Sequence, residues 1–408
     1  MIWQFASRYF RAKKSTNAIN IIAWVSVSAI AVGVAALIII LSVFNGFEGL
    51  VKSLYSSFYP SVKVSPVSGK SIHLTADQLK KIAGVKGVAH MTEVIEEKAV
   101  LRYGDGDQTI AVLKGVDSNY NQVASVNKSI VRGHYDTGDE LAYRAVLGLE
   151  LEMALGVDVE RSLVPLTVYL PRRNITSVTT PEEALGSGIL YPSGSFAIQQ
   201  EFNSKYVITH IDFMRGVLGM APDEMSALEI RAQAGVDDND LKVRLKQLLG
   251  NNYHLETRYE QNQSLYAIMQ TEKWAVYVIM SFIMVIAAFN MIGSLYMLVM
   301  EKQKDITILK AMGARSSLIT KIFLMEGLII AGIGTLIGFF ISIVFCVLQE
   351  KFGLVKLQGQ SFLVDSYPVS MHLMDFVLVS ITIIIIGVAA SWYPARRAGR
   401  QQVALKAT

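Results

Sequence analysis

Few side chains in this sequence have the types and spacing that catalysis requires. Gly69-Lys70-Ser71 resembles the end of a phosphate-binding loop, but that motif needs a glycine five positions before Gly69, where Val64 stands. The six histidines are scattered, and neither the H-E-x-x-H pair of zinc proteases nor the G-x-S-x-G turn of serine hydrolases occurs. We therefore predict no enzymatic activity, no catalytic or metal-ligating residues and no cofactor in this chain.

The composition indicates a membrane protein. The 408 residues are 52% hydrophobic and only 18% charged, whereas soluble domains carry about a quarter charged residues. Such a chain is not disordered, and it is not expected to be wholly soluble. The single cysteine, Cys346, excludes an intramolecular disulfide framework and a cysteine-based zinc cluster.

Four stretches contain no Asp, Glu, Lys or Arg, and they span residues 21–46, 274–300, 327–349 and 376–395. Each has the roughly 20 residues needed to cross a hydrocarbon core of about 30 Å. The alternative, buried core helices, is disfavoured because core helices seldom run so long without a charge. The first stretch exceeds the roughly 7–15 apolar residues of a cleaved signal sequence, so we interpret it as a retained anchor.

The basic residues predict the orientation. They cluster before the first stretch, between the second and third, and after the fourth, where acidic residues are few. By the positive-inside rule these three regions are cytoplasmic. The predicted order is a cytoplasmic N-terminus (1–20), transmembrane helix 1 (21–46), an extracytoplasmic α+β domain with a helical stalk (47–273), transmembrane helix 2 (274–300), a cytoplasmic coupling loop (301–321), transmembrane helix 3 (322–349), a short outer loop (350–375), transmembrane helix 4 (376–395) and a cytoplasmic C-terminus (396–408).

The inserted segment shows mixed strand and helix patterns. The sequence KAVLRYGDGDQTIAVLKGV predicts a hairpin with its turn at Gly104–Gly106. TADQLKKIAGV and DDNDLKVRLKQLL predict amphipathic helices, capped by Thr75 and by Asp238 or Asn239. LVPLTVYLP and SKYVITHI predict strands. The fold class is therefore a membrane protein with four transmembrane α-helices and a large α+β domain inserted between the first two.

The cytoplasmic loop carries an apolar stripe, because Ile306, Leu309 and Met312 recur at three-residue intervals. Gly313 suits the end of this short helix, and Ser316 or Ser317 can cap the next one. We expect no core for this stripe within the chain. It either lies on the bilayer or docks into a partner protein.

Small and polar residues within the spans predict helix packing. Ala29 and Gly33, and likewise Gly334 and Gly338, are spaced four apart and allow helices to approach closely. Asn290 needs a partner for its amide. Glu326 either snorkels to the interface or makes a polar contact with a neighbouring span.

Three segments of the sequence resemble permeases of the lipoprotein-releasing ABC transporter, the LolC/LolE family. FASRYFRAKKS followed by VSAIAVGVAALIIILSVFNGFE is similar to the start of that family. MEKQKDITILKAMGARSSLITKIFLMEG and YPARRAGRQQVALKA resemble the loop and the C-terminus of the wider FtsX/MacB-type permease superfamily. The spacing of the four spans and the large insert also fits this family.

The resemblance implies a function in lipoprotein release at the bacterial inner membrane, with a periplasmic inserted domain and both termini in the cytoplasm. The implied partners are a separate LolD-like ABC ATPase that binds ATP and Mg²⁺, a second permease subunit (itself or a paralogue), a periplasmic carrier, the lipoprotein substrate and membrane lipid, with no nucleic acid. The implied ATPase-coupling residues are Glu301, Lys302, Asp305, Ile306, Leu309, Met312 and Gly313.

The long polar segment between two predicted strands is the candidate carrier-binding loop, since the resemblance places a hook for the carrier there. Its candidate residues are Arg172, Arg173, Asn174, Ile175, Pro181, Ile189 and Pro192. Two other functions stay open: an FtsX-like signalling scaffold for a periplasmic hydrolase, and the permease of a MacB-class peptide or drug exporter.

Overall fold

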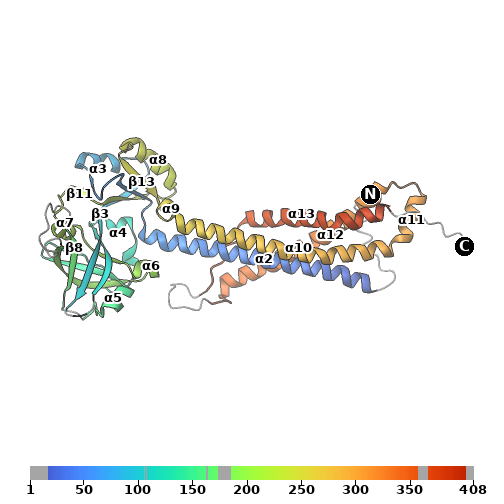
Figure 1. Ribbon diagram of the computed structural model, residues 1–408, viewed down its shortest axis with the longest axis horizontal. Coiled ribbons are helices and arrows are strands. Elements are labelled where there is room, and N and C mark those ends of the chain that lie inside the picture. Colours follow the sequence, from blue (N-terminus) through green and yellow to red (C-terminus); the bar gives the residue numbers. More distant parts are fainter. Residues whose placement is uncertain are drawn as a thin grey trace. The chain divides into compact units, whose positions relative to one another are not determined.

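The computed structural model describes residues 17–104, 106, 108–161, 164–172, 185–356 and 366–400. The chain forms two units. Of the described residues, those within 17–50, 267–356 and 366–400 form the membrane unit, and those within 51–266 form the inserted domain. Figure 1 labels the helices and strands of both units.

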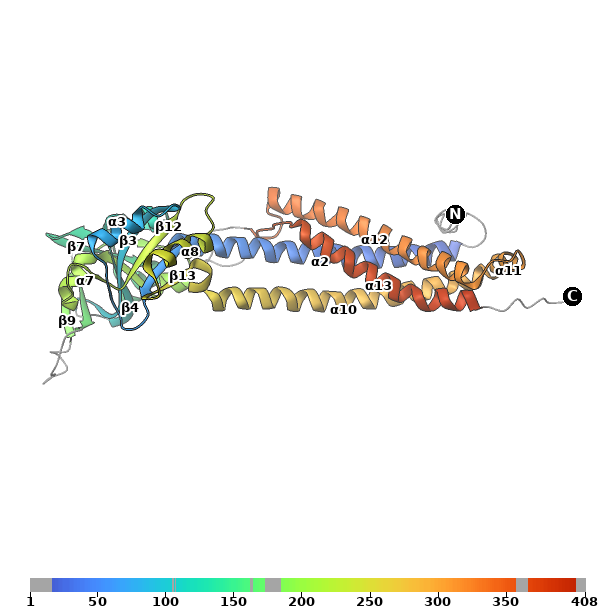
Figure 2. The ribbon, with the colours of Figure 1, turned by 90° about the horizontal axis from the view of Figure 1, so that it is seen from above.

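Four long apolar helices build the membrane unit: α2 (Asn17–Phe58), α10 (Gln263–Glu301), α12 (Ser316–Phe352) and α13 (Leu373–Arg400). All four are long and apolar enough to cross a membrane. Figure 2 shows them from a second side, with the short helix α11 (Gln303–Ala311) connecting α10 to α12. Each helix extends beyond the uncharged stretch from which it was predicted.

Glycines let these helices approach one another. A Cβ atom on Gly334 of α12 would lie 2.9 Å from Ile30 of α2, and one on Gly338 would lie 2.7 Å from the carbonyl oxygen of Ala31. A Cβ atom on Gly33 would collide with Met284 of α10. Their small size therefore serves packing within the chain, of the kind that small residues provide between membrane helices.

The inserted domain is built on an 11-stranded mixed sheet with the order β13-β1-β12-β3-β4-β10-β7-β9-β5. Strand β6 pairs with β7, strand β8 bridges β3 and β9, and β2 and β11 pair separately. The strands are β1 (Val62–Pro66), β2 (Ile72–His73), β3 (Val88–Tyr103), β4 (Gln108–Val116), β5 (Ile130–Gly133), β6 (Gly138–Asp139), β7 (Ala142–Gly148), β8 (Leu166–Pro171), β9 (Leu185–Phe196), β10 (Tyr206–His210), β11 (Glu224–Met225), β12 (Ala227–Ala232) and β13 (Tyr253–Thr257).

Short helices cover the sheet and close two apolar cores. They are α3 (Ala76–Ala83), α4 (Tyr120–Val123), the 3₁₀ turn η1 (Val126–Ser129), α5 (Leu149–Leu155), α6 (Gln200–Asn203), α7 (Ile211–Leu218), α8 (Asp238–Leu249) and α9 (Arg258–Gln261). One core lies between α5, α7 and the strands around β3 and β8. The other joins α3 and α8 to β1 and β12.

The local predictions for this domain are mostly confirmed. Strands β3 and β4 pair antiparallel as the expected hairpin, and Thr75 caps α3 with a full capping box. The predicted cap of α8 is wrong by one residue, because the side chain of Asp237 accepts the hydrogen bond from the amide of Asn239. In the membrane unit, the predicted cap of α12 is also wrong, because Arg315 is the N-cap residue and Ser316 already belongs to the helix. The predicted fold class is confirmed.

The chain enters and leaves the inserted domain through two neighbouring strands. Strand β1, which follows α2, pairs antiparallel with β13, which precedes α9 and α10, over the register Val62↔Thr257 to Pro66↔Tyr253. Arg258 secures this entry because its amide donates a hydrogen bond to the carbonyl of Ser61, and its guanidinium donates to the carbonyl of Tyr59 and the hydroxyl of Ser61. The ends of the two long helices are thus tied to one β-ladder.

Candidate functional site

Helix α11 is fixed to the ends of the long helices by a small apolar core. Ile306 is only 3% exposed and packs in this core. The expectation that the stripe of α11 has no core within the chain is therefore wrong for Ile306. The other members of the core, from α10, α12 and α13, are Leu298, Val299, Ile319, Phe323, Ala395 and Ala398.

The outward face of α11 is apolar at two positions. Ile308 is 58% exposed, and Met312, the residue that caps the C-terminus of α11, is 78% exposed; their four-residue spacing places them on one side of the helix. We call them the docking pair. Leu309 is half-buried, and Gly313 follows the helix with a φ of +89°. Sequence reasoning included Met312 but missed Ile308, although the i, i+4 spacing of the two residues was a signal for this second face.

Polar contacts reinforce this attachment. The ammonium of Lys310 donates a 2.8 Å hydrogen bond to the carbonyl of Gly399 in α13. A Cβ atom on Gly399 would lie 2.8 Å from the carbonyl oxygen of Ser316, so α12 and α13 touch there. Lys302, the one residue between α10 and α11, forms a 3.6 Å ion pair with Asp305, and Glu301 ends α10 with a half-buried side chain. A force applied to α11 would therefore reach three membrane helices.

The opposite end of the membrane unit holds a polar group of side chains, which we call the outer-end cluster. Asn45 of α2 donates a 2.5 Å hydrogen bond to Asp375 of α13 and accepts a 2.6 Å hydrogen bond from Lys273 of α10. Asn45 also donates to the carbonyl of Ser370. A Cβ atom on Gly46 would lie 2.7 Å from the amide nitrogen of Val369. Asn45 and Gly46 therefore join three helices at one point.

The predicted helix-packing residue Asn290 faces outward. Its side chain is exposed, and its carbonyl accepts a hydrogen bond from Ser26 of α2. Among the described residues, no hydrogen bond is formed by its amide group. Ala29 is half-buried in α2.

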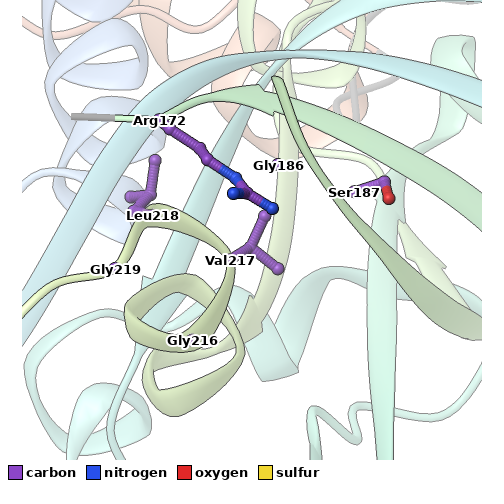
Figure 3. A pocket seen from close by; sticks show the side chains of 7 residues that line it. All are labelled: Arg172, Gly186, Ser187, Gly216, Val217, Leu218 and Gly219. Atoms are coloured by element: carbon purple, nitrogen blue, oxygen red, sulfur yellow. The ribbon is translucent and has the colours of Figure 1, made fainter. Parts of the chain in front are cut away.

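Part of the candidate carrier-binding loop lies outside the described residues, namely Arg173, Asn174, Ile175 and Pro181. Arg172 ends the described part of this chain segment beside a pocket of about 540 Å³, and Figure 3 shows its side chain next to Val217 and Leu218 of α7. Ile189 is 55% exposed on β9. Pro192 is buried and opposite Ala145 of β7, so the expectation that it contacts a carrier is wrong.

A row of four charged side chains, two basic and two acidic, crosses four adjacent strands of the inserted domain. Lys63 of β1, Glu229 of β12, Glu96 of β3 and Lys114 of β4 stand on neighbouring strands of the sheet. Lys114 lies 2.7 Å from Glu229 and 3.2 Å from Glu96, and Lys63 lies 3.2 Å from Glu96. Lys114 and Glu229 are each 1% exposed.

Aromatic rings cover this charged row. The ammonium of Lys114 lies 4.7 Å from the ring centre of Phe58, the last residue of α2, and 5.2 Å from that of Tyr120. Both distances suit cation–π attraction. Burial opposes the ammonium form, but Glu229, Tyr120 and Glu96 outweigh burial and raise the pKa of Lys114. The charged row therefore belongs to the part of the domain that receives α2.

The charged row predicts a loss of stability in acid. Burial works against ionisation of Glu96, but Lys114 and Lys63 outweigh burial and hold its pKa at about 2, below the ordinary 4.5. Its contribution to stability should be present above pH 4.5 and be lost as the pH falls from 4.5 to 2. Scanning calorimetry should show this fall in the unfolding temperature of the domain. A Glu96→Gln variant should show a flatter profile, and an equally steep profile would contradict this assignment.

These elements define a class of protein: four membrane-spanning helices with a large α+β domain inserted between the first two, and a short anchored helix between the second and third. The profile of the MacB-like periplasmic core domain matches residues 23–248, more than half of the chain, and that of the FtsX-like permease C-terminal region matches residues 277–403. The chain belongs to the family of membrane proteins with a MacB-like periplasmic core domain.

Curated relatives align over nearly the whole chain. The lipoprotein-releasing system transmembrane protein LolC of Xylella fastidiosa (strain 9a5c) is 27% identical, covering 97% of this chain and 96% of its own length. LolE of Haemophilus influenzae is 25% identical, with coverages of 97% and 96%. The periplasmic region of MacB from Actinobacillus actinomycetemcomitans aligns with 53% of this chain and 98% of its own, at 11% identity and a TM-score of 0.36. The resemblance to LolC/LolE is thus confirmed.

Proposed function

We propose that this chain is the permease subunit of an ABC transporter that extracts lipoproteins from the inner membrane and passes them to a periplasmic carrier. Near full-length similarity to LolC and LolE proteins supports this function. The structural observation that carries it is the anchored α11, because a partner that moves α11 acts on α10, α12 and α13 together. No described feature favours the signalling-scaffold or the drug-exporter function.

In this proposal a separate ATPase binds ATP and Mg²⁺, and its conformational change is transmitted to this chain through the docking pair. An apolar pair on a short helix suits a groove on a partner protein. The movement is then transmitted along α10 and α2 to the β1–β13 ladder, where Arg258 links the two chain segments by hydrogen bonds. The inserted domain responds to this movement and transfers lipoprotein to the carrier.

The proposal places the protein in the inner membrane with both termini in the cytoplasm, since basic residues concentrate at the α11 end of the helices. A second permease subunit, either a copy or a paralogue, packs on the exposed face of α10. Asn290 supports this pairing, because an amide in hydrocarbon needs a hydrogen-bond partner. The carrier binds at the end of the inserted domain that bears Arg172 and Ile189.

Replacing both residues of the docking pair by aspartate should release the ATPase. Burying an apolar side chain contributes about 1.5–3 kcal/mol, and a buried unpaired charge costs more. We expect the affinity for the ATPase to fall at least about 100-fold in Ile308→Asp/Met312→Asp. Affinity purification of the detergent-solubilised protein, with the ATPase quantified by mass spectrometry, measures this loss.

The control is Leu141→Asp, which replaces an apolar side chain by one aspartate at a residue that is 94% exposed in the inserted domain. This variant should retain the ATPase. Retention of the ATPase by the docking-pair variant would instead indicate that α11 lies on the bilayer.

A further inference from the structure

A buried carboxyl group lies beneath α11. Glu326 belongs to the inward face of α12 and is only 1% exposed. Phe323, one turn earlier, packs in the core that holds Ile306. Neither carboxyl oxygen of Glu326 has a hydrogen-bond partner among the described residues. The expectation that Glu326 snorkels to the interface is therefore wrong.

Neighbouring helices pack closely around this position. A Cβ atom on the neighbouring Gly327 would lie 2.8 Å from the Cβ atom of Ser391 in α13 and 3.1 Å from Leu295 in α10, so both helices close around this part of α12. Replacing buried ionic groups by apolar ones of similar size is often neutral or stabilising. An ionisable residue that is retained within a membrane span is therefore a candidate for a functional role.

Lys302 is the basic residue that stands one turn before Ile306, and Ile306 packs in the same core as Phe323, one turn before Glu326. It stands between α10 and α11, its side chain is 18% exposed, and it makes the 3.6 Å pair with Asp305. Two carboxyl groups, Asp305 on α11 and Glu326 on α12, thus stand on helices that pack together beside Lys302. A change in the position of α11 relative to α12 would alter which carboxylate is closer.

We propose that Glu326 is a positioning residue for coupling, and that Lys302 exchanges Asp305 for Glu326 as its ion-pair partner when the ATPase moves α11. This inference rests on the proposed function and deepens it. In the structure described here Lys302 pairs with Asp305, and Glu326 is unpaired. The second state is stabilised because Glu326 then gains a charged partner in a site that excludes water.

The test uses the whole transporter in proteoliposomes and measures lipoprotein released per ATP hydrolysed. Glu326→Gln and Glu326→Leu should still bind the ATPase, yet release on the order of tenfold less per ATP, within the usual range of coupling between sites. Lys302→Met should show a similar loss. The double variant Lys302→Met/Glu326→Gln should lose no more than either single variant, because the two residues act as one pair.

Thermal unfolding separates coupling from structure. Glu326→Leu should unfold at the same temperature as the unaltered protein or higher, whereas a structural carboxyl would lower it. Two controls should keep normal release: Thr335→Val removes a hydroxyl that donates to the carbonyl of Ala331 within α12, and Lys321→Gln removes an exposed charge.

Three results would overturn the inference: normal release by both Glu326 variants, losses that multiply in the double variant, or joint loss of ATPase binding and thermal stability in Glu326→Gln. Failure of the proposed function has a different signature, because the unaltered protein would then bind no ATPase and release no lipoprotein.

Discussion

Lys114→Met should lower the free energy of unfolding of the inserted domain by about 3–5 kcal/mol, the usual cost of removing one partner from a buried ion pair. Glu229 would remain 1% exposed without the ammonium that lies 2.7 Å away. The cation–π contacts with Phe58 and Tyr120 would also be lost. Methionine fills a similar volume, so the loss reports the charge rather than a cavity.

Pulse proteolysis in urea measures this change in the full-length protein, because cleavage within residues 51–266 reports unfolding of that domain. The double variant Lys114→Met/Glu229→Leu should recover most of the stability, since it removes both buried charges and leaves the Lys63–Glu96 pair in place. A single Lys114→Met variant as stable as the unaltered protein would show that the pair contributes no net stability.

Asn45→Ala should destabilise the membrane unit by about 2–3 kcal/mol, because hydrogen bonds to charged groups contribute about 1.5–3 kcal/mol. An amide is suited to this place, since it donates to the carboxylate of Asp375 and accepts from the ammonium of Lys273. Asn45→Asp should destabilise the membrane unit more than Asn45→Ala does, because it places a second carboxylate beside Asp375.

Tryptophan fluorescence can follow this unfolding selectively. The sequence has no tryptophan between residues 51 and 266, whereas Trp24, Trp274 and Trp392 belong to the membrane unit, and Trp274 follows Lys273 directly. Ser281→Ala is the matched control, because its hydroxyl donates a hydrogen bond to the carbonyl of Tyr277, one turn earlier in the same helix. Equal melting temperatures for Asn45→Ala and Ser281→Ala would contradict a stabilising outer-end cluster.

The sequence predicts those features that depend on residues close to one another along the chain. Uncharged stretches identify the four long helices, and the alternation around Gly104 identifies the β3–β4 hairpin. The error at Ile306 has a physical cause, because its core is assembled from the ends of α10, α12 and α13, far away in the sequence. Local periodicity shows that a face is apolar, but it does not show what covers that face.

Long-range polar pairs are harder to predict. Asn45 meets Lys273 and Asp375, which are 228 and 330 positions away, and Lys114 meets Glu229 across 115 positions. Single charged residues in strands normally indicate a solvent-facing side, and here the end of α2 covers them. Tertiary structure alone brings these residues together.

The β1–β13 ladder makes the inserted domain a transplantable module. Its first and last strands are hydrogen-bonded neighbours, so the chain leaves the domain about 5 Å from where it entered. An insertion with adjacent ends adds little constraint to the host helices, whatever the size of the domain between them. Exchange of this domain between permeases therefore needs only two cuts, one on each side of a single strand pair, and substrate handling could diversify while the membrane helices stay unchanged.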